Sequence, residues 1–315
     1  MNKNISFFNI LKVIKLNLKE LFIFGFFSSA LSLAIALYLP NEYRSYAVLS
    51  PKEKSSEIDT QGLGNLANLG GVSSIIGGGS NQHFDESLEI LQSNKFLGQF
   101  LQNKFVELLA PKKFDANLNK IIIDPKKYNT YKDKWVRKPS SPWGIIPEEQ
   151  EAIKYFRENN FDLSINRRNN FVTIGIKHIS PEVSHKWLVE LISQLDEKIR
   201  TRDVNEANEA LTYLNERLSK TTTSNDVKNS LSKLAVKYEK TILFANINKE
   251  FAFNIIDPPF VPILKDSPKR AVIVLAIVFG MMSVFFTYLI FLFNSKRKLS
   301  IKLLRLNISL LIIEE

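Results

Sequence analysis

Cysteine is absent from this sequence of 315 residues, and histidine occurs only three times. The absence of cysteine excludes cysteine nucleophiles, thiolate metal sites and thiol redox chemistry. It decides little about the compartment, because a domain of this size can form a core without disulfides. The histidines are His83, His178 and His185. The last two lie seven residues apart across a predicted helix start, so they do not form the i, i+4 pair of a zinc-binding helix.

Sequence motifs of catalysis are missing as well. The sequence contains no Gly-x-Ser-x-Gly motif, no phosphate-binding loop and no zinc signature. Carboxylates are plentiful, but most fall on predicted helix faces, where solvation or pairing between subunits is their ordinary role. These are Glu190, Asp196, Glu197, Glu206, Glu209 and Glu216. We therefore predict no enzyme activity, no catalytic residue, no cofactor and no metal site.

Charge is absent from two long hydrophobic segments near the ends of the chain, Leu21–Leu39 and Ala271–Phe293. As helices they would span ~28 and ~35 Å, enough to cross a hydrocarbon core of ~30 Å. The first is followed by Leu39-Pro40-Asn41-Glu42 and not by a small-residue cleavage site, so we predict an uncleaved anchor. The alternative for each segment is a buried core helix.

The net charge of +10 is concentrated beside these segments. Residues 1–20 and 294–315 each carry +3, Lys269 and Arg270 add +2, and residues 41–268 hold only +2. Positive charge next to membrane spans sets topology, so we expect both tails in the cytoplasm and the middle on the other side, although Lys269 and Arg270 oppose this rule. Because the positive charge flanks the hydrophobic segments and is not concentrated in the middle domain, we do not expect nucleic acid as a partner. Two membrane spans that flank a large outer domain are typical of proteins of the bacterial inner membrane. We therefore expect this location, with the middle segment in the periplasm.

The first half of the middle segment predicts a strand, a loop and a helix. Tyr43–Leu49 is rich in aromatic and β-branched residues, which is typical of a strand. Residues 62–79 hold seven of the twelve glycines and predict a mobile loop without the pattern of a phosphate site. Asp85–Phe105 has apolar residues at helical spacing. Asp124–Lys138 interleaves lysines with Tyr128, Tyr131 and Trp135, which indicates either a solvated loop or a surface for an acidic glycan.

The second half predicts a helix, a β-hairpin and two long helices. Helix Glu148–Asn159 precedes strands Phe161–Ile165 and Phe171–Ile176. Ser180-Pro181 then predicts a helix start, with serine as N-cap and proline at the first helical position. The helical pattern continues to about Lys220, or ~60 Å. A second helix from Val227 to about Glu250 should return beside it, before a strand at Phe251–Ile256.

The apolar stripe of the long helix becomes narrow beyond Arg200. Its last members are Leu211, Leu214 and Leu218. A long helix with so narrow a stripe gains stability by packing against a neighbour. We therefore predict contact with other subunits at these leucines, and a homo-oligomer.

A proline-rich connector joins the final strand to the second hydrophobic segment. Its prolines, which fix φ and remove backbone donors, predict a stiff, extended connector. They are Pro258, Pro259, Pro262 and Pro268. In the two apolar segments, small residues are candidates for close helix contact, with exposure to lipid as the alternative. These are Gly25, Ser28, Ser29 and Ser32 in the first segment, and Gly280 and Ser283 in the second.

At this point the chain resembles the chain-length determinant family, the bacterial polysaccharide co-polymerases. The resemblance is carried by YRSYAVLSP after the first span, DESLEILQSNKFL, ISPEVSHKWLVELISQL and, most specifically, FNIIDPPFVPILKDSPKRAVIVLAIVFG. Lys265 stands where a further proline is often found in the family. No kinase domain follows the second span, so the chain resembles the short subtype without one.

The resemblance implies an α+β membrane protein with two transmembrane helices flanking a periplasmic α/β base and a long protruding helical hairpin. We expect a cytoplasmic tail (1–20), the first span (21–39), the base (40–180), the hairpin (181–250), the final strand with the connector (251–270), the second span (271–293) and a second cytoplasmic tail (294–315). Residues 299–315 form an apolar and basic tail that could lie along the membrane surface.

The resemblance also implies a non-catalytic regulator of surface polysaccharide length, such as that of lipopolysaccharide O-antigen. Its expected partners are further copies of the chain in a ring or bell, the polymerase in the membrane, the growing glycan and the lipid bilayer. The alternative is an inner-membrane adaptor for capsule or exopolysaccharide export, which shares this topology. A two-span sensory receptor would need a cytoplasmic signalling domain, and only 22 residues follow Phe293.

Overall fold

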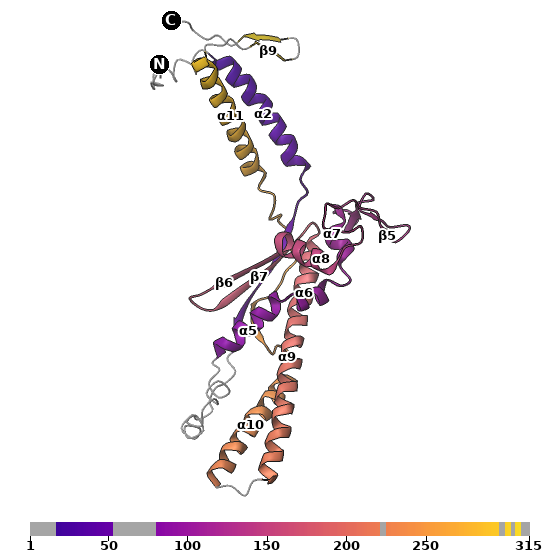
Figure 1. The fold of residues 1–315 in the computed structure, drawn as a ribbon, viewed down its shortest axis with the longest axis vertical. Coiled ribbons are helices and arrows are strands. Elements are labelled where there is room, and N and C mark those ends of the chain that lie inside the picture. The colour runs from indigo at the N-terminus through magenta and orange to yellow at the C-terminus, as the bar shows by residue number, and fades with distance from the viewer. Residues whose placement is uncertain (1–16, 53–79, 221–224, 296–299, 304–305, 310–315) are drawn as a thin grey trace. The chain divides into compact units, whose positions relative to one another are not determined.

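The computed structural model describes residues 17–52, 80–220, 225–295, 300–303 and 306–309 (Figure 1). It divides into two units. The first comprises Met1–Asn41 and Lys265–Glu315, and the second is Glu42–Leu264. The predicted loop at residues 62–79 lies outside the described residues.

The first unit contains two apolar helices that lie against each other, α2 (Leu18–Tyr38) and α11 (Arg270–Ser295). Only 17% of the apolar window of α2 and 11% of that of α11 is buried. The core helix of a soluble protein is mostly buried, so these exposed surfaces favour contact with lipid. In the described part of the tail, strands β9 (Ser300–Leu303) and β10 (Leu306–Ser309) pair antiparallel.

The second unit is built on a four-stranded antiparallel sheet with the strand order β6-β7-β1-β8. The strands are β1 (Tyr43–Pro51), β6 (Phe161–Asn166), β7 (Phe171–His178) and β8 (Phe253–Asp257). The central strands β1 and β7 align Ala47 with Ile174 and Leu49 with Val172. All four of these side chains are fully buried, so this register places one apolar face of the sheet in the core.

Helices cover the apolar face of the sheet. They are α5 (Ser80–Gln92), α6 (Asn94–Leu101), α7 (Phe105–Leu109) and α8 (Glu149–Tyr155), which a π-helical turn at Phe156–Asn160 follows. The helix predicted at Asp85–Phe105 is divided, because Ser93 accepts a hydrogen bond from the Phe96 N–H at 3.2 Å and so caps a new helix. Gly98 leaves room for α8, since a Cβ at this position would lie 1.9 Å from the Glu149 carboxylate.

The long helical hairpin is present as predicted. Helix α9 runs from Pro181 to Lys220, and α10 runs from Asn225 to Ile247 beside it (Figure 1). Ser180 Oγ accepts the Val183 N–H at 3.4 Å, which confirms serine as the N-cap and proline as the first helical residue. The first turns of α9 pack across β1 and β7, where Trp187, Leu188 and Leu191 are buried in the core. The predicted fold class, α+β with two terminal apolar helices and one very long helix, is confirmed.

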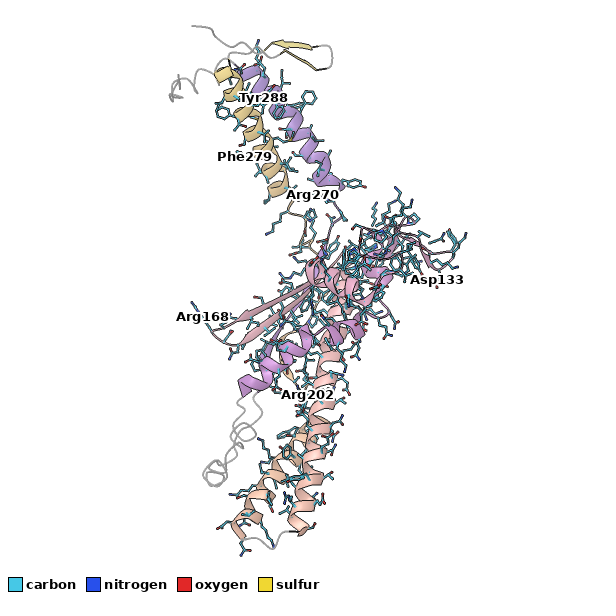
Figure 2. All side chains as sticks on the ribbon, viewed as in Figure 1. Asp133, Arg168, Arg202, Arg270, Phe279 and Tyr288 are labelled. Carbon is cyan, nitrogen blue, oxygen red and sulfur yellow. The ribbon has the colours of Figure 1, made fainter. Side chains whose placement is uncertain are left out.

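Residues 111–147 form two small β-hairpins beside this core. Strand β2 (Pro111–Asp115) pairs with β3 (Lys120–Ile123), and β4 (Tyr128–Asn129) pairs with β5 (Lys134–Trp135). Asp133 marks the outer tip of the second hairpin (Figure 2). Asn119 and Asp133 adopt positive φ at the two turns, a conformation that asparagine and aspartate tolerate better than most residues.

Candidate functional site

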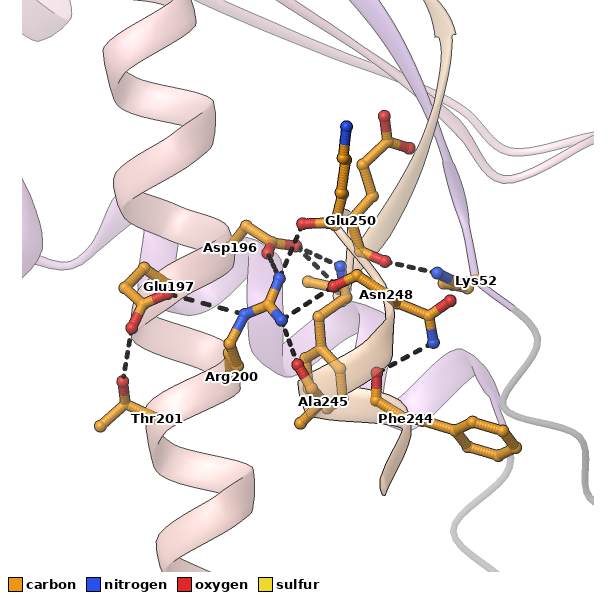
Figure 3. Close-up of polar contacts among 12 residues, drawn as sticks. Lys52, Asp196, Glu197, Arg200, Thr201, Phe244, Ala245, Asn248 and Glu250 are labelled. Atoms are coloured by element: carbon orange, nitrogen blue, oxygen red, sulfur yellow. Dashed lines mark hydrogen bonds and ion pairs between the residues drawn. The ribbon is translucent and has the colours of Figure 1, made fainter. Parts of the chain in front are cut away.

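The polar centre of the second unit lies at the root of the helical hairpin, where Arg200 of α9 meets the end of α10 (Figure 3). Its guanidinium donates to the carbonyl oxygens of Ala245, Asn248 (2.9 Å) and Lys249 (2.7 Å). The last carbonyls of a helix have no partner within it and carry its negative dipole end. Arg200 therefore caps the C-terminus of α10 with a positive charge.

Asp196, one turn earlier on α9, completes this arrangement. Its Oδ2 accepts from Arg200 at 2.8 Å, and its Oδ1 accepts the backbone N–H groups of Phe251 (2.8 Å) and Ala252 (2.7 Å). The Arg200 guanidinium lies 5.6 Å from the centre of the Phe251 ring. We call Asp196 and Arg200 the hairpin clasp, because together they bind both the end of α10 and the segment that leads into β8.

The clasp revises one prediction about Asp196. Sequence alone assigned this carboxylate to a solvated or intersubunit face. Only 15% of the Asp196 side chain and 20% of that of Arg200 are exposed, and both bind backbone of the same chain. Glu190 is also paired within the chain, with Lys104 at 2.8 Å. In the sequence, only the spacing of four residues between Asp196 and Arg200 indicated that the two side chains pair. Ordinary ion pairs on exposed helix surfaces have the same spacing, so it did not reveal the buried clasp.

The proline connector begins where β8 ends. Pro258 and Pro259 have no N–H to continue the ladder, so pairing with β1 stops at Asp257. Beyond them, Phe260 is held to β1, since its carbonyl accepts the Ser45 hydroxyl at 2.8 Å and its ring meets Tyr46 edge-on at 5.0 Å. Pro262 is buried. Ile263 and Leu264 are 92% and 84% exposed, so the connector leaves the sheet as an unpacked apolar segment.

Pro268, the last proline of the predicted motif, belongs to the first unit and is partly buried. Near it, Arg270 donates to the Asn41 side chain at 3.0 Å, which joins the start of α11 to the residues after α2. The predicted role of the four prolines as a stiffening motif stays a prediction.

The small residues predicted at the helix contact fall into two groups. Ser28 and Ser32 are buried between α2 and α11 together with Ala36, at a spacing of four residues. Gly25 lies close to Met282, and Phe24 stacks on Phe285 at 4.3 Å. Ser29, Gly280 and Ser283 are exposed, and a Cβ at Gly280 would meet nothing within 4 Å. These three residues lie outside the contact between the two helices of one chain, and a role for them toward other helices stays a prediction.

The leucine stripe predicted to contact other subunits already has a place in the single chain. Leu211 and Leu214 are 8% and 6% exposed, and Leu218 is partly buried, on the part of α9 that lies beside α10. Intersubunit contact is therefore not needed to cover Leu211 and Leu214. Contact with another copy at this stripe stays a prediction.

His178 is a buried histidine at the start of α9. Its Nδ1 accepts the Ser180 N–H at 3.1 Å, so its Nε2 carries the proton and donates to the Glu107 carbonyl at 3.1 Å. Burial lowers the pKa of His178, although both backbone contacts oppose this effect. A neutral imidazole in this tautomer connects β7, α7 and the helix start, which is a structural role. Burial likewise raises the pKa of Tyr155, with a smaller contribution from Glu42.

We expect the free energy of unfolding to fall as the pH drops below about 6.5, the ordinary pKa of histidine. The pKa of His178 is lower in the folded chain, so the unfolded chain is protonated first as the pH falls. The contribution of the neutral His178 to the free energy of unfolding is therefore complete above this pH and is lost below it. Urea unfolding of the full chain at a series of pH values measures the slope. His178→Gln should reduce the slope, whereas His185→Gln, a partly exposed control, should keep it. An unchanged slope in His178→Gln would contradict the assignment.

Among the described residues, no group of three or more histidine, aspartate or glutamate side chains is placed to hold a metal ion. The side-chain clusters of this part of the chain are ion pairs and backbone caps, such as the hairpin clasp. What this geometry can do is hold a long helical hairpin at a fixed angle to a sheet.

The architecture defines the class of protein, one with two terminal apolar helices and an α+β domain that carries a long helical hairpin. A family model matches the N-terminal part of the sequence. Residues 3–104, about a third of the chain, match the model of the family described as "Chain length determinant protein" (Wzz). This part of the chain is therefore similar to the chain length determinant family. The matched region ends before the proline connector.

Two solved structures align with the chain at low similarity. A full-length bacterial polysaccharide co-polymerase aligns over 92% of this chain and 98% of its own, with 13% sequence identity and a TM-score of 0.35. A fragment of WzzB, a polysaccharide co-polymerase from Salmonella Typhimurium, aligns over 72% of this chain and 100% of its own, with 12% identity and a TM-score of 0.34. No curated protein matches the sequence significantly.

Proposed function

We propose that this protein is a non-catalytic inner-membrane regulator that sets the chain length of a surface polysaccharide, such as lipopolysaccharide O-antigen, by acting as an oligomeric scaffold on the polymerase. The observation that carries the proposal is the match of residues 3–104 to the chain length determinant family. The order of apolar helix, α/β base, hairpin, proline connector and apolar helix supports it. In this proposal the base and the hairpin lie in the periplasm, both tails are cytoplasmic, and the growing glycan passes along the assembled copies.

An apolar face of α10 supports the oligomeric part of the proposal. Val236, Leu243 and Ile247 are 55%, 54% and 64% exposed in the single chain, at spacings of seven and four residues that place them on one side of the helix. An exposed apolar stripe on a helix is typical of a contact surface. Packing of this face against the next copy would stabilise both hairpins.

Deleting the gene tests the proposal. We expect the polysaccharide to lose its preferred length, so that gel electrophoresis shows a broad distribution in place of a modal cluster of bands. Expression of the full chain should restore the cluster. The Glu197→Ala variant, which changes an exposed carboxylate, should restore it equally well.

Two outcomes would overturn the proposal. An unchanged length distribution after deletion would exclude length control. Polysaccharide of normal length that no longer reaches the cell surface would instead support an export adaptor.

A further inference from the structure

The segment 111–147 differs in charge from the rest of the extramembrane part. It contains eight lysines, one arginine and three aspartates, a net charge of +6, whereas the remainder of residues 41–268 carries −4. Four of these lysines, on and beside the β4–β5 hairpin, are exposed and form no ion pair with any residue that the structure describes: Lys126, Lys132, Lys134 and Lys138. The positive charge is therefore local and available to a partner.

Exposed apolar side chains occupy three loops of the same segment. Leu118 is 67% exposed in the β2–β3 turn, Tyr131 is completely exposed in the β4–β5 turn, and Ile145 and Ile146 are 57% and 72% exposed in the loop before α8. Single exposed apolar residues are common on protein surfaces. Here one or two lie in each of three loops of a single segment that also carries the unpaired lysines, and we call these loops the basic–apolar tips.

The loop that carries Ile145 and Ile146 is held in place. Arg137 donates to the carbonyls of Gly144 and Ile145, both at 2.9 Å, and forms an ion pair with Glu151 of α8. These contacts use the backbone of the loop and leave both isoleucine side chains outside. The exposure is therefore built into the fold.

The chain connection limits the distance between the start of β1 and the end of the first apolar helix. Phe114 of β2 meets Tyr43 edge-on, with ring centres 6.5 Å apart. Tyr43 is the fifth residue after Tyr38, the last residue of α2. Five extended residues reach at most ~18 Å. The end of α2 thus lies within that distance of the strand residue that Phe114 contacts.

We propose that the basic–apolar tips bind the anionic phospholipid surface of the membrane that the apolar helices cross, with the lysines at the headgroups and the leucine and isoleucine side chains below them. Basic residues next to apolar side chains are the composition of interfacial membrane-binding surfaces. This contact would be a second attachment to the bilayer and would fix the direction in which the base faces it.

The aromatic residues favour lipid over an acidic glycan as the partner. The Trp135 ring lies edge-on to Tyr128 at 5.1 Å, and the Arg137 guanidinium lies 5.5 Å from its centre. The Trp135 ring is thus engaged within the protein, although the Tyr131 ring is exposed. The aliphatic side chains of Leu118, Ile145 and Ile146 offer no hydrogen bond to a glycan but can enter a lipid surface.

Single-cysteine labelling tests the proposal, because the chain has no cysteine of its own. Ile146→Cys and Leu118→Cys, labelled with an environment-sensitive fluorophore, are placed with the full chain in nanodiscs. The discs contain phosphatidylcholine alone or mixed with phosphatidylglycerol, and spin-labelled lipid serves as quencher. We expect quenching and a blue shift of emission in the mixed discs, and a loss of both when Lys126, Lys132, Lys134 and Lys138 are replaced by glutamine.

Tyr213→Cys, at an exposed position of α9 in the hairpin, is the matched control and should not be quenched. Absence of quenching at both Ile146→Cys and Leu118→Cys in mixed discs would overturn the proposal. A response of these labels to polygalacturonate in detergent, without a response to lipid, would also overturn it and assign the surface to acidic glycans. Neither result depends on polysaccharide length control, so the proposed function is tested separately.

Discussion

Trp187→Ala is expected to lower the free energy of unfolding by about 3–5 kcal/mol, the usual cost of removing a buried tryptophan. The side chain is 1% exposed, and its ring meets Phe100 at 6.3 Å, Phe156 at 6.4 Å and His178 at 5.2 Å. These partners come from α6, the π-helical turn and the end of β7. The substitution would therefore leave a cavity where the helices, the sheet and the start of α9 meet.

Urea unfolding of the full chain in detergent, followed by far-UV circular dichroism, measures this loss. Trp143→Ala removes a partly exposed tryptophan from the loop before α8 and serves as the matched control. We expect it to cost less than about 1 kcal/mol. Equal losses in the two variants would show that Trp187 does not organise the core.

Asp196→Ala is expected to cost about 3 kcal/mol, because it breaks a largely buried ion pair and removes the acceptor of two backbone N–H groups. Arg200 would lose the nearer of its two carboxylate partners, and the amides of Phe251 and Ala252 would lose their acceptor. Hydrogen exchange of these two amides should accelerate in the variant, in addition to the loss measured by urea unfolding. If the angle of the hairpin matters for the proposed function, polysaccharide length control should weaken as well.

Glu197→Ala is the control for the clasp. Glu197 is the next residue on α9 and lies 3.6 Å from the same guanidinium, but its side chain is 70% exposed. An exposed pair contributes about 0–1 kcal/mol, so the loss should be small and the two amides should stay protected. Comparable effects of the two substitutions would refute the clasp.

Local signals in the sequence were sufficient for the long elements. Ser180 and Pro181 define a helix start through groups within one turn of each other, so the start of α9 could be predicted to the residue. The length of α9 followed from uninterrupted periodicity. The break at Ser93 was missed, because apolar periodicity continues across it and only the cap reveals two helices.

The site residues were harder to predict, because their partners are distant in sequence. Arg200 binds carbonyls 45 to 49 residues further along the chain, and no spacing rule reports such contacts. Leu211 and Leu214 were correctly recognised as an apolar stripe, but a stripe does not reveal what covers it. Ser28 and Gly280 are both small residues in apolar segments, so the sequence predicted a helix contact at both. In the structure Ser28 is buried, whereas nothing lies within 4 Å of a Cβ at Gly280.

The placement of β1 beside β8 has a mechanical consequence. Strand β1 begins five residues after α2 ends, β8 leads through the connector to α11, and the two strands are hydrogen-bonded neighbours within one sheet. A displacement of either helix along its axis would therefore act on one of two neighbouring strands of the same sheet. Because α9 packs on β1, a tilt of this strand would tilt α9 as well. The far end of the long hairpin would then move the most.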